Sequence, residues 1–264
     1  MTDETLKILE TGYNAFYANW GGSPTLRSLW RQHVTGTDFP EQFEHISFVR
    51  LADLESLRRG LDLTPGATLV DLGCGAGGPG LWVARQAQAR LIGIDLSSIA
   101  VACAAKRARE VGVDHAPAFR QGTFERTGLD TASADGVMSV DAIQYGPDTA
   151  ATFAEFARVL RPGGKLAFVA FELDAQRVAG LPIWRDPIAD YRPHLERAGF
   201  RVFRYEQLTG WVDQVVAGYS AVLGAQGALE AELGAAAEPL IAEATITLEV
   251  QPYSGHAFAV AIRT

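Results

Sequence analysis

The chain has 264 residues, 48% of them hydrophobic, and a mean hydropathy of +0.05. This composition excludes a disordered chain and predicts one α/β domain with a substantial core, or such a domain with an appended lid. The formal net charge is −8 and the basic residues are scattered, so no nucleic-acid partner is expected.

The N-terminus is acidic and lacks the basic region and apolar core of a secretory signal. No stretch approaches the roughly 18 uncharged apolar residues of a membrane span, so no membrane partner is expected. Cys74 lies in a glycine loop and Cys103 in a helical stretch, which makes a mutual disulfide improbable. These features predict a soluble protein of the cytoplasm.

Residues 1–63 are expected to form a helical cap. They are mainly helical in pattern, and aromatic side chains recur at Tyr13, Phe16, Tyr17, Trp20 and Trp30. Aromatics at helical spacing are more often core residues than ligand contacts, and both roles stay open for this cluster. His33 and His45 are candidate lid residues in the same region.

Residues 64–209 are expected to form a doubly wound α/β core. Between Gly66 and Glu172, strand-like runs alternate with helical patterns, which predicts parallel strands joined by right-handed crossovers. The expected strands span residues 68–72, 91–95, 118–121, 136–140 and 165–171, and the expected helices span 80–88, 98–111 and 149–160. An Arg-Pro-Gly-Gly turn at 161–164 is expected to close the last helix.

The stretch from Thr68 to Gly80 is the most informative, because an apolar run passes through Asp71 into a glycine-dense turn. Glycines there allow a bound nucleotide close to the backbone and tolerate the positive φ of a tight strand-to-helix turn. The spacing Gly73-x-Gly75-x-x-Gly78 also fits a dinucleotide fingerprint and hence a nicotinamide oxidoreductase. Asp71 within the strand, and the lack of an obvious Tyr-x-x-x-Lys pair, argue against that alternative.

Asp95 is expected at the carboxyl end of the second strand, about 20 residues after the glycine turn. A carboxylate there can accept hydrogen bonds from both hydroxyls of a ribose. The alternative is a helix N-terminal acid, because Ser97 and Ser98 follow. We favour the ribose contact.

After Glu172 the pattern is helical over 190–198, extended over 201–207, helical and alanine-rich over 212–244, and extended over 257–262. We interpret residues 210–250 as one long helical insertion that forms a lid over a substrate pocket; a packing layer is the alternative. Residues 251–264 then supply the final core strand of a single domain.

Four segments together resemble the motifs of the class I S-adenosylmethionine-dependent methyltransferases. The segments are 70–77 (VDLGCGAG), 93–97 (GIDLS), 121–125 (QGTFE) and 158–166 (RVLRPGGKL). The resemblance covers residues 66–172 and implies a seven-stranded Rossmann-like sheet with an antiparallel last strand. It implies S-adenosylmethionine as cofactor and no metal, with cofactor contacts from Asp71, Gly73, Cys74, Gly75, Asp95, Leu96, Gly122, Thr123, Phe124, Ser139 and Tyr17. Thr123 stands where the family often has aspartate, so its adenine contact is weaker or comes from the backbone.

The resemblance does not supply a base. Small-molecule members of the family often carry paired histidines after strand four, where this chain has Gln144 and Tyr145. Tyr145 can orient a substrate, or act as a base only with a pKa far below about 10. Glu172, just beyond strand five, and His256, which begins the final strand, are the replacement candidates because both are expected at the ligand-binding edge of the sheet.

We expect a methyltransferase that acts on a mid-sized, partly apolar metabolite, as in bacterial natural-product tailoring, with oxygen favoured over carbon or nitrogen as acceptor. The missing histidines leave open a second hypothesis, an S-adenosylmethionine-binding enzyme that catalyses a cyclisation or rearrangement without methyl transfer. A non-catalytic binding role is a third. A homodimer through the helical additions is a further hypothesis.

Overall fold

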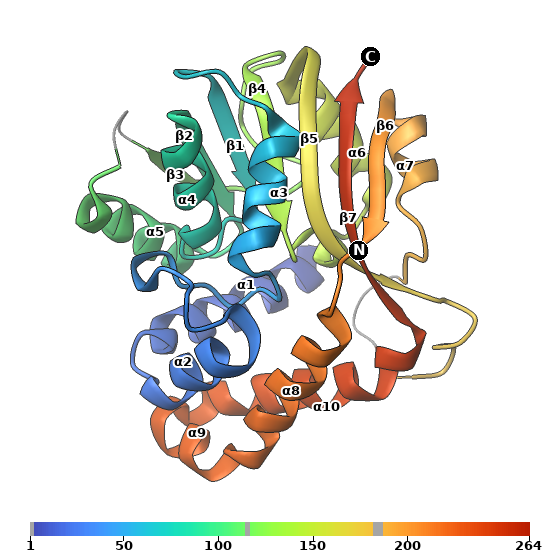
Figure 1. The fold of residues 1–264 in the computed structure, drawn as a ribbon. Helices are drawn as coiled ribbons and strands as arrows, with labels where there is room; N and C mark the ends of the chain where they lie inside the picture. Colours follow the sequence, from blue (N-terminus) through green and yellow to red (C-terminus); the bar gives the residue numbers. More distant parts are fainter. Residues whose placement is uncertain (1–2, 114–116, 182–186) are drawn as a thin grey trace.

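The computed structural model describes residues 3–113, 117–181 and 187–264. Its centre is a seven-stranded sheet with the order β3-β2-β1-β4-β5-β7-β6 (Figure 1). The strands are β1 (Thr68–Leu72), β2 (Arg90–Asp95), β3 (Ala118–Gln121), β4 (Ala134–Val140), β5 (Leu160–Leu173), β6 (Phe200–Gln207) and β7 (Ser254–Arg263). Neighbouring strands from β3 to β5 pair in parallel, whereas β7 is antiparallel to both β5 and β6. The predicted fold class is confirmed.

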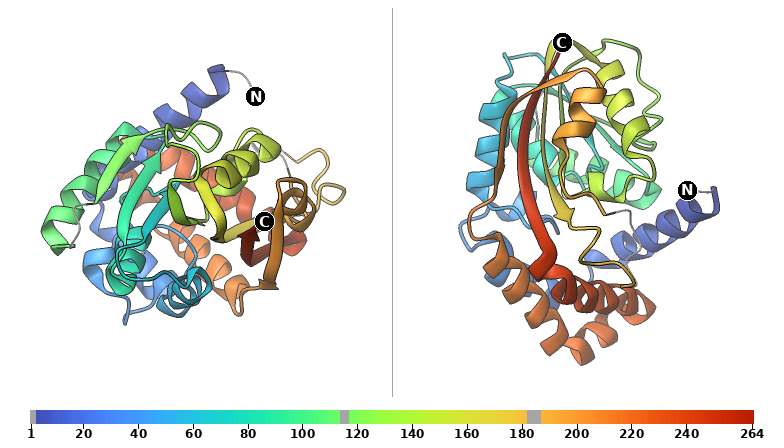
Figure 2. Two further views of the ribbon diagram at one scale, coloured as in Figure 1. Left: turned by 90° about the horizontal axis from the view of Figure 1, so that it is seen from above. Right: turned by 90° about the vertical axis from the view of Figure 1, so that its right-hand side faces the viewer.

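Helices cover both faces of the sheet (Figure 2). α3 (Leu51–Leu61), α4 (Gly78–Ala87) and α5 (Ser98–Val111) contribute to the apolar cluster on one face, and α6 (Thr149–Val159) and α7 (Arg192–Arg197) to the cluster on the other. Successive side chains of a strand point to opposite faces, so in β1 Leu69 packs in the first cluster and Val70 and Leu72 in the second. This double burial explains the unbroken apolar run that predicted the strand.

A third layer, purely helical, lies across the carboxyl ends of the parallel strands, below the sheet in Figure 1. It contains α1 (Asp3–Trp20), α2 (Pro24–Trp30), α8 (Trp211–Gly224), α9 (Gln226–Leu233) and α10 (Ala237–Val250). Trp20, Trp30, Trp211 and Tyr219 share one apolar cluster with Phe171 at the end of β5. The N-terminal aromatics and the insertion therefore form a single cap.

The insertion expected to be helical over 210–250 is divided into separate helices. α8 ends at Gly224, and Gly234, which ends α9, has φ +56 and ψ −130, a conformation that other residues rarely adopt. The result is three helices that fold back over the sheet. Short helical turns complete the chain at Arg31–Thr35, Glu41–Phe43, Ile143–Tyr145, Gly234–Ala236 and Gln251–Tyr253.

The expected turn at 161–164 also differs. α6 ends at Val159, but residues 161–164 fall within the bounds of β5. Gly163 there has φ +79, and the β4–β5 register shifts between Ala134 and Gly136. The proline and glycines thus produce an irregular entry into the strand.

Candidate functional site

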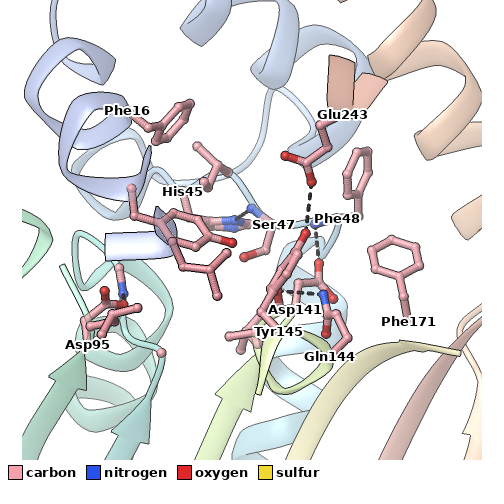
Figure 3. Close-up of a pocket in the computed structure, with 18 of the residues that line it drawn as sticks. Phe16, His45, Ser47, Phe48, Asp95, Asp141, Gln144, Tyr145, Phe171 and Glu243 are labelled. Atoms are coloured by element: carbon pink, nitrogen blue, oxygen red, sulfur yellow. Dashed lines mark hydrogen bonds between the residues drawn. The ribbon is translucent and has the colours of Figure 1, made fainter. Parts of the chain in front are cut away.

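A cavity of about 550 Å³ lies between the sheet and the helical cap (Figure 3). One end is lined by the β1–α4 glycine loop and by the residues that follow β2 and β3. The other end is lined by side chains from α2, α8 and α10 and by residues 44–48, and side chains of α1 border both ends. The cavity therefore joins the predicted cofactor site to the space beneath the insertion.

The glycine loop is shaped by φ angles and close approaches that exclude side chains. Gly73 has φ +71 and Gly75 has φ +51. A Cβ at Gly73 would lie 2.4 Å from Cβ of Ala142, and one at Gly75 would lie 2.3 Å from the hydroxyl of Tyr17. The amides of Gly73 and Cys74 both donate to the carbonyl of Ile94, at 2.8 and 3.1 Å, which fixes the loop against β2.

Two carboxylates lie beside this loop. Asp95 accepts the amide of Gly75 at 2.8 Å through Oδ2 and the amide of Ser97 at 2.9 Å through Oδ1. Asp71 is 2% exposed, and burial, followed by the charge of Asp95, raises its pKa to about 8. Burial also raises the pKa of Asp95. A pair of neighbouring buried acids favours a ligand that carries positive charge.

Helix α1 closes the cofactor end of the cavity. Oδ1 of Asn14 accepts the Ser97 hydroxyl at 2.7 Å, and Gln121, the last residue of β3, donates its side-chain amide to Glu10 at 2.8 Å. α1 therefore contacts both the β2 and β3 ends. No sequence pattern pointed to Asn14, because only the folded chain brings α1 to these strands.

Twelve of the predicted site residues line the cavity: Asp71, Gly73, Cys74, Gly75, Asp95, Leu96, Gly122, Thr123, Phe124, Tyr17, Gln144 and Tyr145. The Phe124 ring packs on Gly73, since a Cβ there would lie 3.1 Å from its Cζ. Ser139, Glu172 and His256 are absent from the described lining.

Ser139 and Glu172 are turned away from the cavity by the alternation of their strands. The Ser139 hydroxyl donates to the carbonyl of Leu72 at 2.7 Å and ties β4 to β1. Phe171 lines the cavity, so Glu172 faces the other side of β5. Its carboxylate accepts the Tyr205 hydroxyl and, at 2.6 Å, the amide of Gln207. Both residues are therefore placed as structural contacts.

His256 lies behind residues that line the cavity and is hydrogen-bonded to one of them, Asp141. The imidazole is 0% exposed and stacks on Phe171 with ring centroids 4.2 Å apart. Its Nε2 lies 2.6 Å from Oδ1 of Asp141, which does line the cavity. Asp141 has φ +51, and its carbonyl accepts the side-chain amide of Gln144 at 2.8 Å. Sequence reasoning missed Asp141, although an acid just after strand four was the available signal.

Polar side chains of the core and the cap meet at the cap side of the cavity. The Tyr145 hydroxyl donates to Oε1 of Glu243 at 2.9 Å (Figure 3). The Tyr219 hydroxyl lies 3.3 Å from the same oxygen. His45, also in the lining, accepts the amide of Ser47 at 3.2 Å through Nδ1. Burial lowers the pKa of His45 to about 4, so the ring is neutral at pH 7.

Across residues 3–113, 117–181 and 187–264, His, Cys, Asp and Glu nowhere gather in threes in a way that would hold a metal ion. Within those same ranges, every helix is too short or too polar to cross a membrane.

Residues 70–168 match the family model described as "Methyltransferase domain". The chain is 28% identical over 213 residues to 27-O-demethylrifamycin SV methyltransferase of Amycolatopsis mediterranei. The aligned region covers 75% of each chain. It is 33% identical over 173 residues to 24-methylenesterol C-methyltransferase 2 of Oryza sativa subsp. japonica, covering 62% of this chain but 43% of the relative. Among solved structures, the [4+2]-cyclase SpnF superposes with a TM-score of 0.77 at 22% identity, over 97% of this chain and 94% of SpnF. At that identity, the likeness to SpnF shows the fold alone.

Proposed function

Because this chain belongs to the class I S-adenosylmethionine-dependent methyltransferases, we propose that it methylates a hydroxyl group of a mid-sized, partly apolar metabolite. The observation that carries the proposal is the continuity of the cavity from the Asp95 loop to the aromatic space under the cap. The relative named for O-methylation aligns over three quarters of both chains, and this similarity supports oxygen over carbon as the acceptor.

The residues at the cofactor end fit S-adenosylmethionine. Gly73 and Gly75 line the cavity and carry no side chain, so their backbone is within reach of the methionyl part of the ligand. Asp95 suits the ribose, Phe124 the adenine, and Asp71 the ammonium group through water. A cationic ammonium group near Asp71 would favour the ionised form of this carboxyl. When bound, this cofactor supplies a methyl group that is already activated by the sulfonium.

The protein's own contribution is alignment and exclusion of water. Trp30, Phe48, Phe171, Trp211 and Tyr219 line the acceptor end of the cavity, and these rings favour a ligand with apolar surface. The cap covers the carboxyl ends of the strands, so an acceptor held there is shielded from solvent. Fixed orientation can supply several kcal/mol of the barrier reduction, about 7 kcal/mol or more in well-oriented systems.

The test is a turnover assay with labelled S-adenosylmethionine and a panel of neutral hydroxylated aromatic and macrocyclic acceptors, including umbelliferone and its more acidic trifluoromethyl derivative. Mass spectrometry is expected to detect S-adenosylhomocysteine and a product heavier by one methylene. The Asp95→Ala variant, in which we expect weakened cofactor binding, serves as the control. The proposal is overturned if the native chain forms no labelled ether from any acceptor of the panel.

A second candidate is a cyclisation or rearrangement without methyl transfer. It is favoured by the neutral pair Gln144 and Tyr145, which line the cavity where histidines would supply a direct base. A product isomeric with its substrate, formed without S-adenosylhomocysteine, would favour this second reaction.

A further inference from the structure

We propose that Glu243 is the base of the transfer and that it receives the proton of the acceptor hydroxyl through Tyr145; this inference rests on the proposed O-methylation. Tyr145 lies in the short helical turn after β4, and Glu243 lies on α10 of the cap. The phenol donates to the carboxylate at 2.9 Å, and both side chains line the cavity (Figure 3). The pair thus bridges the core and the cap at the acceptor end.

Other titratable groups in the cavity wall have different tasks. Asp95 belongs to the cofactor end and accepts two backbone amides. Asp141 has His256 on one carboxylate oxygen and a backbone amide on the other. Glu44 forms ion pairs with two arginines at 2.8 and 3.8 Å. The Nδ1 lone pair of neutral His45 already accepts a backbone amide. Glu243 differs from these groups because its carboxylate accepts the hydroxyl of Tyr145, a side chain that lines the cavity.

The relay removes the difficulty of using a phenol as a base. Tyrosine has an ordinary pKa of about 10 and is a poor base alone. In the relay, the Tyr145 oxygen accepts the proton of the acceptor while its own proton moves to Glu243, so no tyrosinate has to accumulate. The oxygen–methyl bond forms as the sulfur–methyl bond breaks. The products are an ether, a neutral thioether and a protonated Glu243, which returns its proton to solvent when the cap opens.

The arrangement makes the base dependent on the position of the cap. Tyr145 is fixed to the sheet edge, whereas Glu243 is carried by the insertion. The Tyr219 hydroxyl on α8, 3.3 Å from the same Oε1, helps to orient the carboxylate. The proton relay is complete only when α8 and α10 cover the cavity, so acceptor binding and chemistry are coupled.

The experiment compares Glu243→Gln and Tyr145→Phe with the native chain, using umbelliferone and its trifluoromethyl derivative as acceptors. Glutamine keeps the size of the side chain and an oxygen for Tyr145 but is not a base. In both variants we expect kcat for umbelliferone to fall about 10²-fold or more relative to the native chain, with a smaller change in KM. The fall should be smaller for the trifluoromethyl derivative, because its more acidic hydroxyl needs less help. Calorimetry with S-adenosylmethionine confirms that each variant is folded.

Glu249→Gln is the matched control, because Glu249 is exposed on the same helix and lies outside the described cavity lining. It should leave kcat unchanged. If Glu243→Gln keeps the native kcat, or if its kcat falls equally with umbelliferone and with the trifluoromethyl derivative, the relay is overturned. The proposed function would stand in either case. No ether from the native chain with any acceptor of the panel would overturn both.

Discussion

Nε2 of His256 lies 2.6 Å from Oδ1 of Asp141, although one residue is in the last strand and the other directly follows β4. The second carboxylate oxygen of Asp141 accepts the amide of Phe48, also at 2.6 Å. Asp141 therefore joins the two strands to the segment that leads from the cap into the core. The acceptor end of the cavity is built around this junction.

Replacing His256 with leucine should lower the free energy of unfolding by about 2 kcal/mol, because a hydrogen bond to a buried carboxylate is worth about 1.5–3 kcal/mol. The Asp141 side chain is 7% exposed, so water cannot readily replace the imidazole. Urea unfolding measures the loss. His194→Leu in α7 is the control for removing a histidine, and a loss in His256→Leu no larger than in this control would show that the junction does not stabilise the fold.

Asp95→Ala should weaken S-adenosylmethionine binding about 10²-fold, since the carboxylate both orders the glycine loop and is proposed to accept the ribose hydroxyls. Titration calorimetry measures the change. The exposed Asp130→Asn should bind like the native chain. Unchanged affinity in Asp95→Ala would rule out a ribose contact at this position.

The cofactor end could be predicted from the sequence because its determinants are local. Gly73, Gly75 and Asp95 come from two consecutive strand ends, and the Gly75–Asp95 contact spans 20 residues. The acceptor end depends on long-range pairs that no pattern announces: Tyr145 and Glu243 are 98 residues apart, and His256 and Asp141 are 115 apart. Such pairs require the three-dimensional course of the insertion.

The alternation of side chains along the strands also limited the prediction of site residues. Ser139 and Glu172 were assigned to the pocket because they lie near the carboxyl ends of β4 and β5. Side chains alternate along a strand, so a displacement of one residue moves a side chain to the opposite face. Val140 and Phe171, each one residue away, line the cavity instead.

Gly73→Ala and Gly66→Ala form a matched pair for the glycine loop. Both glycines have positive φ, +71 and +81, but a Cβ at Gly66 meets nothing within 4 Å, whereas one at Gly73 would lie 2.4 Å from Ala142. Gly66→Ala should therefore cost only the backbone strain, about 1–2 kcal/mol of unfolding free energy, and retain cofactor binding. Gly73→Ala should cost more and lose binding. Native affinity in Gly73→Ala would contradict the close packing of the loop.

The stability of the ligand-free chain should fall as the pH rises from about 5 to about 8, in part because of Asp71. Its pKa is about 8 in the folded chain and ordinary when unfolded, so the folded state holds the proton more tightly. The resulting stabilisation is complete below the unfolded pKa and is lost as the pH rises through the folded pKa. Asp71→Asn cannot titrate and should show a flatter pH dependence in urea unfolding, while the exposed Asp130→Asn should follow the native curve. Parallel curves for Asp71→Asn and the native chain would mean that Asp71 is ionised in the folded protein at neutral pH.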